Sequence, residues 1–474
     1  MPKTTLCYND DIMSFVHLHT HSHYSLLDGL SKPKDFVKKA QEYGMTAVGL
    51  TDHGTMYGVI DFYDTLTKAG IKPIIGVEVY MAKRSLHQKE PGLDSKRYHL
   101  TLLAENNTGY ENLIKLTTIA HLEGFYYKPR IDKETLKKHA EGLICLSGCP
   151  GGELAEALMV NNLNQGRKIV SEFLDIFGHD HYFLEVMNHP EVEKIENIHK
   201  GLKILAQEFN LPFVATYDSH YPDEEDAEAH NTLVAINTGA EVADQTLSLK
   251  NGDYSFISPE KAKTLYQDFP EAVTNTVKIA ERCNVTITLG EFIFPTFDLP
   301  PETTADDELK RLCLLGMEKR GLTKNTEALT RLNYELDIIK MKGYADYFLV
   351  VGDLIRFARE HDIYYNIRGS VAGSMTTYSL DITKLDPIEY QIPFERFLNP
   401  ERPSAPDIDM DFADNRRDEI IEYAKKKYGT DKVAQIGTFG TMMARGSVRD
   451  VARALSYPYA IGDRLAKMIP LGSQ

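Results

Sequence analysis

The chain has 474 residues, of which 42% are hydrophobic and 26% are charged, and its formal net charge at pH 7 is −16. This length predicts two or three domains, and the composition is that of a globular protein. No apolar run approaches the roughly 18 residues of a membrane helix, and the first residues lack the apolar stretch of a secretory signal. Five cysteines with one close pair, Cys145 and Cys149, argue against a disulfide scaffold. We therefore expect a soluble cytoplasmic protein.

Seven strand-like runs in the first half of the chain each carry a potential metal ligand. They are residues 15–19, 46–53, 72–78, 99–106, 142–149, 181–186 and 212–220. In six runs the ligand lies at or just beyond the downstream end, whereas His99 opens the fourth run. Segments with helical spacing of apolar residues separate the runs, which predicts an α/β fold with parallel strands. A parallel barrel gathers the downstream ends of its strands on one face, so the runs predict one shared metal site.

The first run leads into an alternating histidine tract, HLHTHSHYS, which contains His17, His19, His21 and His23. Alternate residues of an extended segment share a face, so two histidines spaced by two residues can bind one ion. Asp28 follows in SLLDG. By itself it would be a turn or helix-cap residue, but its position one short loop after the histidines favours a ligand.

Two of the later runs add donors that could also be structural. Asp52 and His53 in TDHG follow an apolar run, where such residues are either caps or ligands. Glu78 lies inside the apolar segment IIGVEVYMA. Because an isolated buried charge is costly, its carboxylate must be paired, protonated or bound to metal, and we favour metal.

The final run repeats the histidine spacing, since Asp218 and His220 in VATYDSHY offer oxygen and nitrogen donors on one face. His99, Cys149 and Glu185 are weaker signals, because single residues of these types are often satisfied within a core. About nine potential donors exceed what one tetrahedral zinc uses, so two or three ions are predicted. A histidine-rich cluster with bridging carboxylates suits phosphoester hydrolysis.

The sharpest motif of the second half is PDIDMDF at residues 406–412. Asp407 and Asp409 alternate through it and so project from the same side of a strand, where two carboxylates can share a pair of magnesium ions. An acidic edge strand or a calcium loop is the alternative. The apolar residues Ile408 and Met410 argue against a solvated loop.

Two further segments have the composition of phosphate-binding elements. IRGSVAGS at residues 367–374 is a turn that opens a predicted helix, and its N–H groups could bind phosphates or only cap the helix. FERFLNPER places Arg396 and Arg402 near the acids. These guanidinium groups suit a triphosphate, or they form structural ion pairs with Glu395 or Glu401.

The motifs HLHTHSHYSLLDG, LTDHG, GVEVY, LSGC and DSH resemble the polymerase and histidinol phosphatase (PHP) family, whose fold is a distorted seven-stranded (β/α) barrel. The resemblance implies Zn²⁺ or Mn²⁺ ions, two or three in number, and either 3′–5′ exonuclease or phosphatase activity. It implies a full set of metal ligands: His19, His21, Asp28, His53, Glu78, His99, Cys149, Asp218 and His220.

The motifs GYADYFLVVGDLIRFA, RGSVAGS, DITKLDP, FERFLNPER, PDIDMDF, RRDEII and TFGTMMARGSVRDVAR resemble the C-family replicative polymerases, the alpha subunits of bacterial DNA polymerase III. The resemblance implies that Asp407 and Asp409 are two of three catalytic aspartates, which bind Mg²⁺. It also implies that Gly369, Ser370 and Arg396 contact the phosphates of the incoming dNTP.

The same resemblance implies a PHP barrel over residues 1–286, the first part of an α+β palm with a helical insertion over 287–438, and the start of a helical thumb over 439–474. Arg445 and Arg449 would belong to the thumb. The family's third catalytic aspartate and its fingers are not in this sequence, so we expect DNA synthesis from the full-length protein and not from this chain alone. The implied partners are primer–template DNA, dNTPs and other replicase subunits, including the sliding clamp, through regions absent here.

The negative charge is unevenly distributed, which matters for a DNA-binding protein. Residues 412–474 contain 11 Lys or Arg and 7 Asp or Glu, and the rest of the chain contains 42 and 62. The basic end suits contact with duplex DNA, or it is a solvated helix face. Two other functions stay open: a phosphoesterase of the histidinol-phosphatase type acting on a small phosphate monoester, and a non-catalytic barrel that serves as a structural platform.

Overall fold

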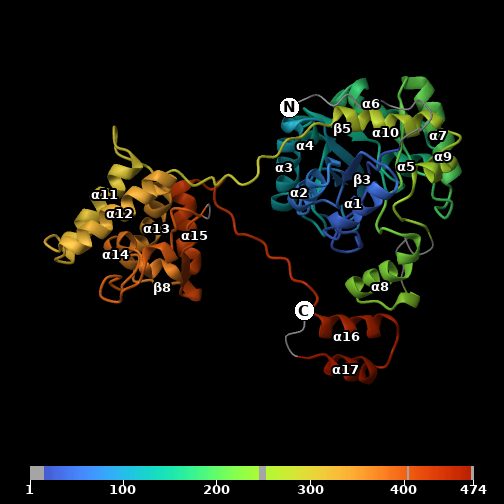
Figure 1. Ribbon diagram of the computed structural model, residues 1–474. Helices are drawn as coiled ribbons and strands as arrows, with labels where there is room; N and C mark the ends of the chain where they lie inside the picture. Colours follow the sequence, from blue (N-terminus) through green and yellow to red (C-terminus); the bar gives the residue numbers. More distant parts are fainter. Residues whose placement is uncertain (1–14, 245–251, 403–404, 471–474) are drawn as a thin grey trace. The chain divides into compact units, whose positions relative to one another are not determined.

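The structure, a computed structural model, describes residues 15–244, 252–402 and 405–470. The chain divides into two compact units, one formed by Met1–Ile287 with Thr441–Gln474 and the other by Thr288–Gly440 (Figure 1). The first unit contains a seven-stranded sheet, and the second contains helices and a two-stranded sheet. Within the described ranges, no helix combines the length and apolarity needed to cross a membrane.

The large sheet has the strand order β1-β2-β3-β5-β6-β7, with β4 paired to β2. The strands are β1 (Ala47–Leu50), β2 (Lys72–Ala82), β3 (Arg97–Ala104), β4 (Arg130–Ile131), β5 (Leu143–Leu146), β6 (Tyr182–Val186) and β7 (Phe213–Ala215). Every residue of β1, β5, β6 and β7 is buried. Burial on both faces is expected for strands whose outer face is covered by helices.

The prediction of parallel strands throughout is wrong for β3. This strand is antiparallel to both β2 and β5, whereas β1–β2, β5–β6 and β6–β7 are parallel. The reason is the connection: residues 83–96 join β2 to β3 without a helix, so the chain reverses instead of crossing over. The reversal pairs His99, near the start of β3, with Tyr80, near the end of β2. The ligand that opens the fourth run therefore lies at the same rim as those that close their runs.

The first predicted run, residues 15–19, is not one of the seven strands, and β4 was not expected. The segment nevertheless bonds to both ends of the sheet. Gly49 N in β1 donates to His17 O at 2.6 Å, and Ser219 N, just beyond β7, donates to His19 O at 3.3 Å. The histidine tract thus joins the two edges of the curled sheet.

Helices surround this sheet, as Figure 1 shows for α3, α5, α6 and α10. Asn106 and Asn162 cap α3 and α6 by accepting from backbone N–H groups of the first turn. The helices are α1 (Pro33–Glu42), α2 (Val59–Lys68), α3 (Asn107–Leu122), α4 (Lys133–Lys138), α5 (Glu153–Met159), α6 (Leu163–Phe177), α7 (Ile195–Phe209), α8 (Ala227–Thr238), α9 (Pro259–Leu265) and α10 (Pro270–Arg282).

The last described residues form a helical hairpin of α16 (Ala444–Ala454) and α17 (Tyr459–Met468). The Arg445 side chain donates to Ile469 O, and Arg449 pairs with Asp463 at 3.0 Å. Both arginines predicted for a thumb thus hold the hairpin together.

The second unit has its own core, built on α11 (Ala305–Lys319), α12 (Thr326–Lys342) and α13 (Ala345–Glu360). The short α14 (Met375–Ser379) and α15 (Arg417–Tyr428) complete its helices, and β8 (Tyr365–Arg368) pairs antiparallel with β9 (Asp409–Phe412). Phe348 of α13 is fully buried in this core.

A buried carboxylate on α13 fixes α15. Asp353 is 3% exposed and accepts hydrogen bonds from Lys427 Nζ at 2.6 Å and from the hydroxyls of Tyr423 and Tyr428, each at 2.9 Å. A buried carboxylate is tolerated because these donors replace its lost hydration.

A second buried carboxylate, Glu335 of α12, holds the start of α14. It accepts from Ser374 Oγ at 2.8 Å and from the N–H groups of Met375 and Thr376, each at 2.9 Å. Arg331 pairs with it at 2.8 Å. The first backbone donors of α14 are therefore satisfied from within the unit.

We predict that Glu335→Ala lowers the free energy of unfolding of the second unit by about 3 kcal/mol, because it leaves buried donors unpaired and the Arg331 charge uncompensated. The control Asp337→Ala removes an exposed carboxylate from the same helix. Urea unfolding of both variants, with hydrogen exchange of peptides from residues 288–440, measures the difference. Equal stability of the two variants would contradict this account of Glu335.

Candidate metal centre

The structure brings the nine residues predicted as metal ligands together at one rim of the sheet. A network of close contacts connects them, running from Asp28 through His53, Glu78 and His19 to Asp218. His21 and His220 contact Asp218, and His99 and Cys149 contact Glu78. Residues from His19 to His220, about 200 positions apart in sequence, therefore lie close together in one small volume.

Glu78 occupies the centre of this cluster. Its Oε1 lies 3.4 Å from His19 Nε2, 2.9 Å from His99 Nδ1 and 3.3 Å from Cys149 Sγ. Its Oε2 lies 2.5 Å from His53 Nδ1. Because its two oxygens face different donors, this carboxylate can bridge two ions.

Asp218 is a second acid of the cluster, and it also faces two histidines. Its Oδ1 lies 3.0 Å from His21 Nε2 and 3.4 Å from His19 Nε2. The residue has a φ of +52°, which is uncommon for a residue other than glycine and is typical of strained functional positions. His220 Nδ1 bonds to the backbone oxygen of Asp218 at 2.7 Å, so its Nε2 is directed elsewhere.

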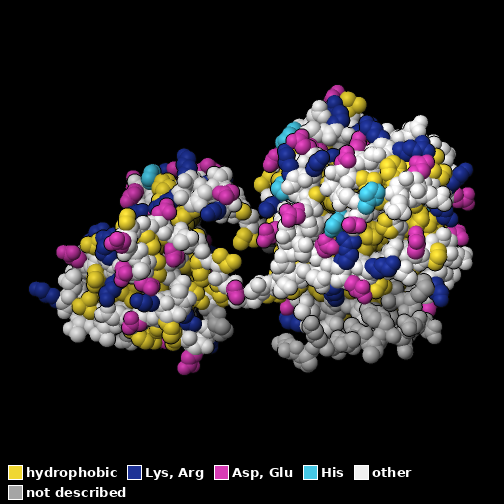
Figure 2. Space-filling view, turned by 90° about the horizontal axis from the view of Figure 1, so that it is seen from above, with side chains coloured by type: hydrophobic (Ala, Val, Ile, Leu, Met, Phe, Trp, Pro, Cys, Tyr) yellow, Lys and Arg dark blue, Asp and Glu magenta, His cyan; other side chains and the backbone are white. Residues whose placement is uncertain are grey.

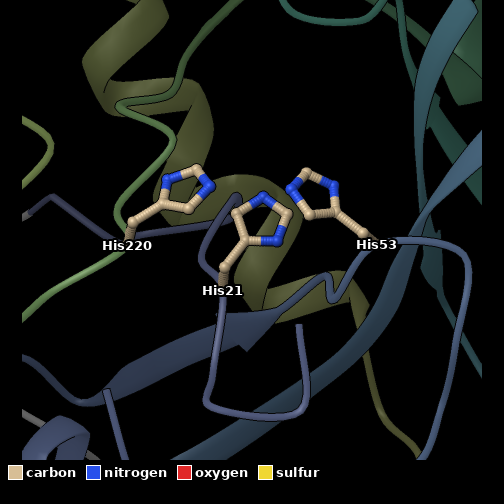
Figure 3. A group of neighbouring side chains, drawn as sticks. All are labelled: His21, His53 and His220. Atoms are coloured by element: carbon tan, nitrogen blue, oxygen red, sulfur yellow. The ribbon is translucent and has the colours of Figure 1, made fainter. Parts of the chain in front are cut away.

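Several buried donor atoms of the cluster have no well-aligned hydrogen-bond partner within the described residues. They are Nε2 of His19, His21 and His220 and Oδ1 of Asp28 and Asp218. Buried polar atoms are rarely left in this state. Figure 3 shows the imidazoles of His21, His53 and His220 side by side, with ring nitrogens facing one another. Three overlapping groups each have their ligand atoms within 4.8 Å of one another: His21, His53 and His220; His19, His21 and Glu78; and His53, Glu78 and His99. Such sets of nitrogen and oxygen donors fit metal ions.

The electrostatic state of the cluster also fits metal ions. Burial opposes charge on His53, but Asp28 and Glu78 outweigh it and raise the pKa of this imidazole well above its usual value. Burial, His53 and His220 together lower the pKa of His21 to about 3. The carboxylates thus favour positive charge nearby, but His21 resists protonation, so the histidines do not supply all of this charge. Cations at the cluster would take the place of the protons, which couples metal binding to proton release.

Glu185, which the sequence offered only as a weak ligand candidate, lies one layer behind the cluster. Its fully buried carboxylate accepts from His19 Nδ1 at 2.8 Å, from Thr216 Oγ1 at 2.7 Å and from Gly148 N at 3.0 Å. This contact fixes the His19 ring with its Nε2 toward the other donors. Its sequence signal was the same as that of Glu78, a single acid in an apolar strand.

Asp52 also acts through neighbours and does not join the cluster directly. It accepts from Ser22 N at 2.7 Å and from Ser25 Oγ at 2.7 Å, and Ser25 Oγ lies 3.0 Å from His21 Nδ1. Burial, opposed by these hydrogen bonds, raises the pKa of Asp52 to about 6. His17 lies away from the cluster: its Nε2 bonds to Ile257 O at 3.0 Å.

The acidic motif of the second unit lies on an exposed face. Asp407, Asp409 and Asp411 all project outward, while the residues between them face the core. Asp411 pairs with Arg368 on the neighbouring strand, at 2.5 Å. Gly369 adjoins the same face, since a Cβ built on it would lie 3.8 Å from Asp409 Oδ2.

The elements predicted to bind phosphates differ in their availability. The N–H groups at the start of α14, which the Gly/Ser-rich turn was expected to present to a phosphate, are bonded to Glu335. Gly369 is exposed and Ser370 is half-buried in the turn that precedes α14. Arg396 is exposed, and Glu395, its proposed ion-pair partner, instead accepts from the Tyr334 hydroxyl. Arg402 is exposed as well.

Comparison with known proteins identifies two family domains. Residues 17–189 match the PHP domain, and residues 307–474 match the bacterial DNA polymerase III alpha NTPase domain. The match to the PHP domain confirms the predicted fold class, and together with the donor set it indicates that the first unit binds metal ions.

Curated proteins with similar sequences include DNA polymerase III alpha subunits. Those of Borreliella burgdorferi and Aquifex aeolicus are 45% and 42% identical over 97% of this chain, and that of Thermus aquaticus is 38% identical over 97%. The chain spans about 40% of the length of these relatives. Among solved structures, an amidohydrolase from Chromobacterium violaceum is similar to part of this chain. The match covers 44% of this chain and 89% of the amidohydrolase, with 16% sequence identity and a TM-score of 0.30.

We predict that Glu185→Gln weakens metal binding by about 10- to 100-fold, because the amide is a poorer acceptor for His19 Nδ1 and no longer fixes the ring. Calorimetric titration with Mn²⁺ and Zn²⁺, with metal content measured on the same samples, tests this. The control is Glu172→Gln, on the outer surface of the barrel unit. Unchanged affinity in Glu185→Gln would show that His19 is held by other contacts.

Metal removal supplies a second prediction. Binding to the folded state alone raises stability by RT ln(1 + [L]/Kd), about 2.7 kcal/mol at a hundredfold excess over Kd. We therefore expect chelation to lower the Tm of the first unit and leave that of the second unit unchanged. Differential scanning calorimetry with and without EDTA measures both transitions.

Proposed function

Because the chain belongs to the family of bacterial DNA polymerase III alpha subunits, we propose that it forms part of a template-directed DNA polymerase. The observation that carries this proposal is the pair of exposed acids Asp407, just before β9, and Asp409, the first residue of β9, of which Asp409 lies beside the turn at Gly369. A small-molecule phosphatase has no use for such a pair on a separate unit. The substrates would be primer–template DNA and dNTPs, and the compartment the cytoplasm.

In the second unit, Asp407 and Asp409 would hold Mg²⁺ ions, which would neutralise charge on the triphosphate of the incoming nucleotide. Gly369, which lies close to Asp409, and its neighbour Ser370 would contact the same phosphates. Arg396 is exposed and would contact the triphosphate from a neighbouring segment. Asp411 differs from the other two acids, since its ion pair with Arg368 holds β8 against β9.

In the first unit, we propose that the cluster hydrolyses phosphodiesters at 3′ ends. When bound, Zn²⁺ or Mn²⁺ ions would supply Lewis-acid polarisation of the phosphate and would make a water more acidic. Glu78 and Asp218 would hold the ions together with the histidines, and Glu185 would hold the His19 ring in place. Hydrolysis breaks the bond between phosphorus and O3′: the water oxygen joins phosphorus, its proton goes to O3′, and a nucleoside 5′-monophosphate leaves.

The surface charge bears on how DNA would be held. Figure 2 shows basic side chains interspersed with acidic ones over the described part of the visible face. Contact with phosphates would therefore depend on local groups and not on a broad basic field. Other replicase subunits, the sliding clamp among them, would bind through regions outside this chain.

The exonuclease proposal predicts that the chain with Mn²⁺ or Zn²⁺ shortens a 3′-labelled primer annealed to a template. His19→Ala combined with Asp218→Ala should lower the rate by at least about a hundredfold, because two ligands of the cluster are lost. Gel analysis of the labelled primer and metal analysis of each protein measure the effect.

The matched control is His87→Ala, which removes an exposed histidine outside the cluster and should not change the rate. If the wild type binds metal without shortening the primer, the exonuclease proposal is wrong. The next substrate would then be a small phosphate monoester, and failure with that as well would leave a structural role for the metals.

The polymerase proposal predicts that Asp407→Asn or Asp409→Asn, placed in the full-length polymerase that contains this chain, lowers primer extension by at least about a hundredfold. Asp414→Asn, a change of an exposed aspartate just beyond β9, should leave extension unchanged. Extension of a labelled primer with all four dNTPs measures the rates. Equal activity of the three variants would contradict the assignment.

A further inference from the structure

A cavity of about 180 Å³ opens directly beside the metal cluster. Its lining includes His53, Tyr24, Tyr57, Tyr80, His121 and Lys128. His53 belongs to the cluster as well, so the cavity and the cluster share a wall. Sites for drug-sized ligands measure about 300–1,000 Å³. This cavity is smaller and suits one planar group next to the reacting atoms.

Two glycines allow the loop after β1 to enclose the cavity. Gly54 has a φ of +61°, and a Cβ there would lie 3.0 Å from both the Tyr80 ring and Pro129. A Cβ on Gly58 would lie 2.6 Å from the Tyr24 ring, closer than real side chains approach. The aromatic walls are therefore held close to the backbone of this loop.

Exposed aromatic side chains lie at the cavity and next to it: Tyr57 is part of the lining, and Phe125 lies beside the lining residue His121. The Tyr57 and Phe125 side chains are 46% and 50% exposed, and the ring centroid of His121 lies 6.1 Å from that of Tyr57 and 6.4 Å from that of Phe125. Large exposed aromatic groups gathered next to a cavity mark binding surfaces. Bases stack on such rings in proteins that bind single strands.

Two cations lie near the Tyr80 ring, and one of them, Lys128, lines the cavity. Lys128 Nζ lies 5.7 Å and Arg97 Cζ 5.6 Å from the centroid of the Tyr80 ring. The His53 ring is stacked against Tyr80 at 6.2 Å. Lys128 therefore places a positive charge in the cavity wall that also contains His53 of the cluster, and this charge favours an anionic group there. Aromatic walls together with cations match a base joined to a phosphate.

We propose that this cavity is the subsite for the 3′-terminal nucleotide of a DNA strand. The base lies against Tyr57 and His121, and Lys128 holds the phosphate at the edge of the metal cluster. This inference rests on the proposed phosphodiester hydrolysis, and it specifies which side chains hold the base and the phosphate of the terminal nucleotide.

The test is calorimetric titration of the Mn²⁺-loaded chain with dAMP, the product of removing one deoxyadenosine nucleotide. Tyr57→Ala should raise the Kd of dAMP at least about fivefold, the lower end of what one base–aromatic stack contributes, and leave the Kd of inorganic phosphate unchanged. Lys128→Ala should weaken both ligands. Tyr57→Phe, which keeps the ring, should bind dAMP as the wild type does. The matched control Tyr390→Ala removes a 59% exposed tyrosine from the second unit and should change neither Kd.

A strand end and a free nucleotide are distinguished by competition. A phosphorothioate-linked thymidine tetranucleotide, which resists hydrolysis, should displace dAMP from the wild type. The inference is overturned if dAMP does not bind, if Tyr57→Ala and Lys128→Ala bind it as the wild type does, or if the tetranucleotide does not displace it.

Hydrolysis of bis(p-nitrophenyl) phosphate, a diester without a nucleoside, reports whether the metal centre hydrolyses phosphodiesters at all. It should proceed equally in the wild type and in the control Tyr390→Ala, which lies in the second unit. If no diester is hydrolysed, the proposed hydrolysis fails, while dAMP binding still decides whether the cavity accepts a nucleotide. If this diester is hydrolysed and dAMP binding is insensitive to Tyr57, only the nucleotide subsite is wrong.

Discussion

The architecture of the first unit depends on the burial of one carboxylate, Glu78, in the middle of β2. An isolated charge in this position would be prohibitively unfavourable. His19, His53 and His99 and the thiol of Cys149 surround it, and each comes from a different part of the sheet. The need to compensate one acid therefore draws the histidine tract, the end of β1, the start of β3 and the loop after β5 to the same rim. The metal centre and the closure of the barrel are consequences of the same interaction.

Two acids behind the cluster fix the orientation of its histidines. Glu185 and Asp52 are both buried and hydrogen-bonded. Glu185 contacts Nδ1 of His19, and Asp52 reaches Nδ1 of His21 through the Ser25 hydroxyl. Each fixes which ring nitrogen faces inward, as outer-layer carboxylates do in metal sites. The cluster is thus prepared for cations by neighbours that do not reach them.

Residue types and spacing were sufficient to predict which side chains gather at one rim of the sheet, because alternating donors at strand ends have few structural uses. The direction of β3 was not predictable in this way, since an apolar strand reads alike in both directions. It is decided by residues 83–96, whose backbone oxygens at Leu86, Gln88 and Asp94 accept from the buried guanidinium of Arg130. The role of Glu185 was equally hidden, because its partner His19 is 166 positions away.

Under the proposed function, the acids of the two units would bind cations in opposite ways. The barrel buries its acids among histidines, so its donors are assembled before any substrate arrives. Asp409 in β9 and Asp407 just before it are exposed, and the nearby helix start is already occupied by Glu335. Magnesium is commonly held by one or two carboxylates together with substrate phosphates. Exposed acids fit such a site, because in the proposed function the triphosphate would supply the remaining ligands.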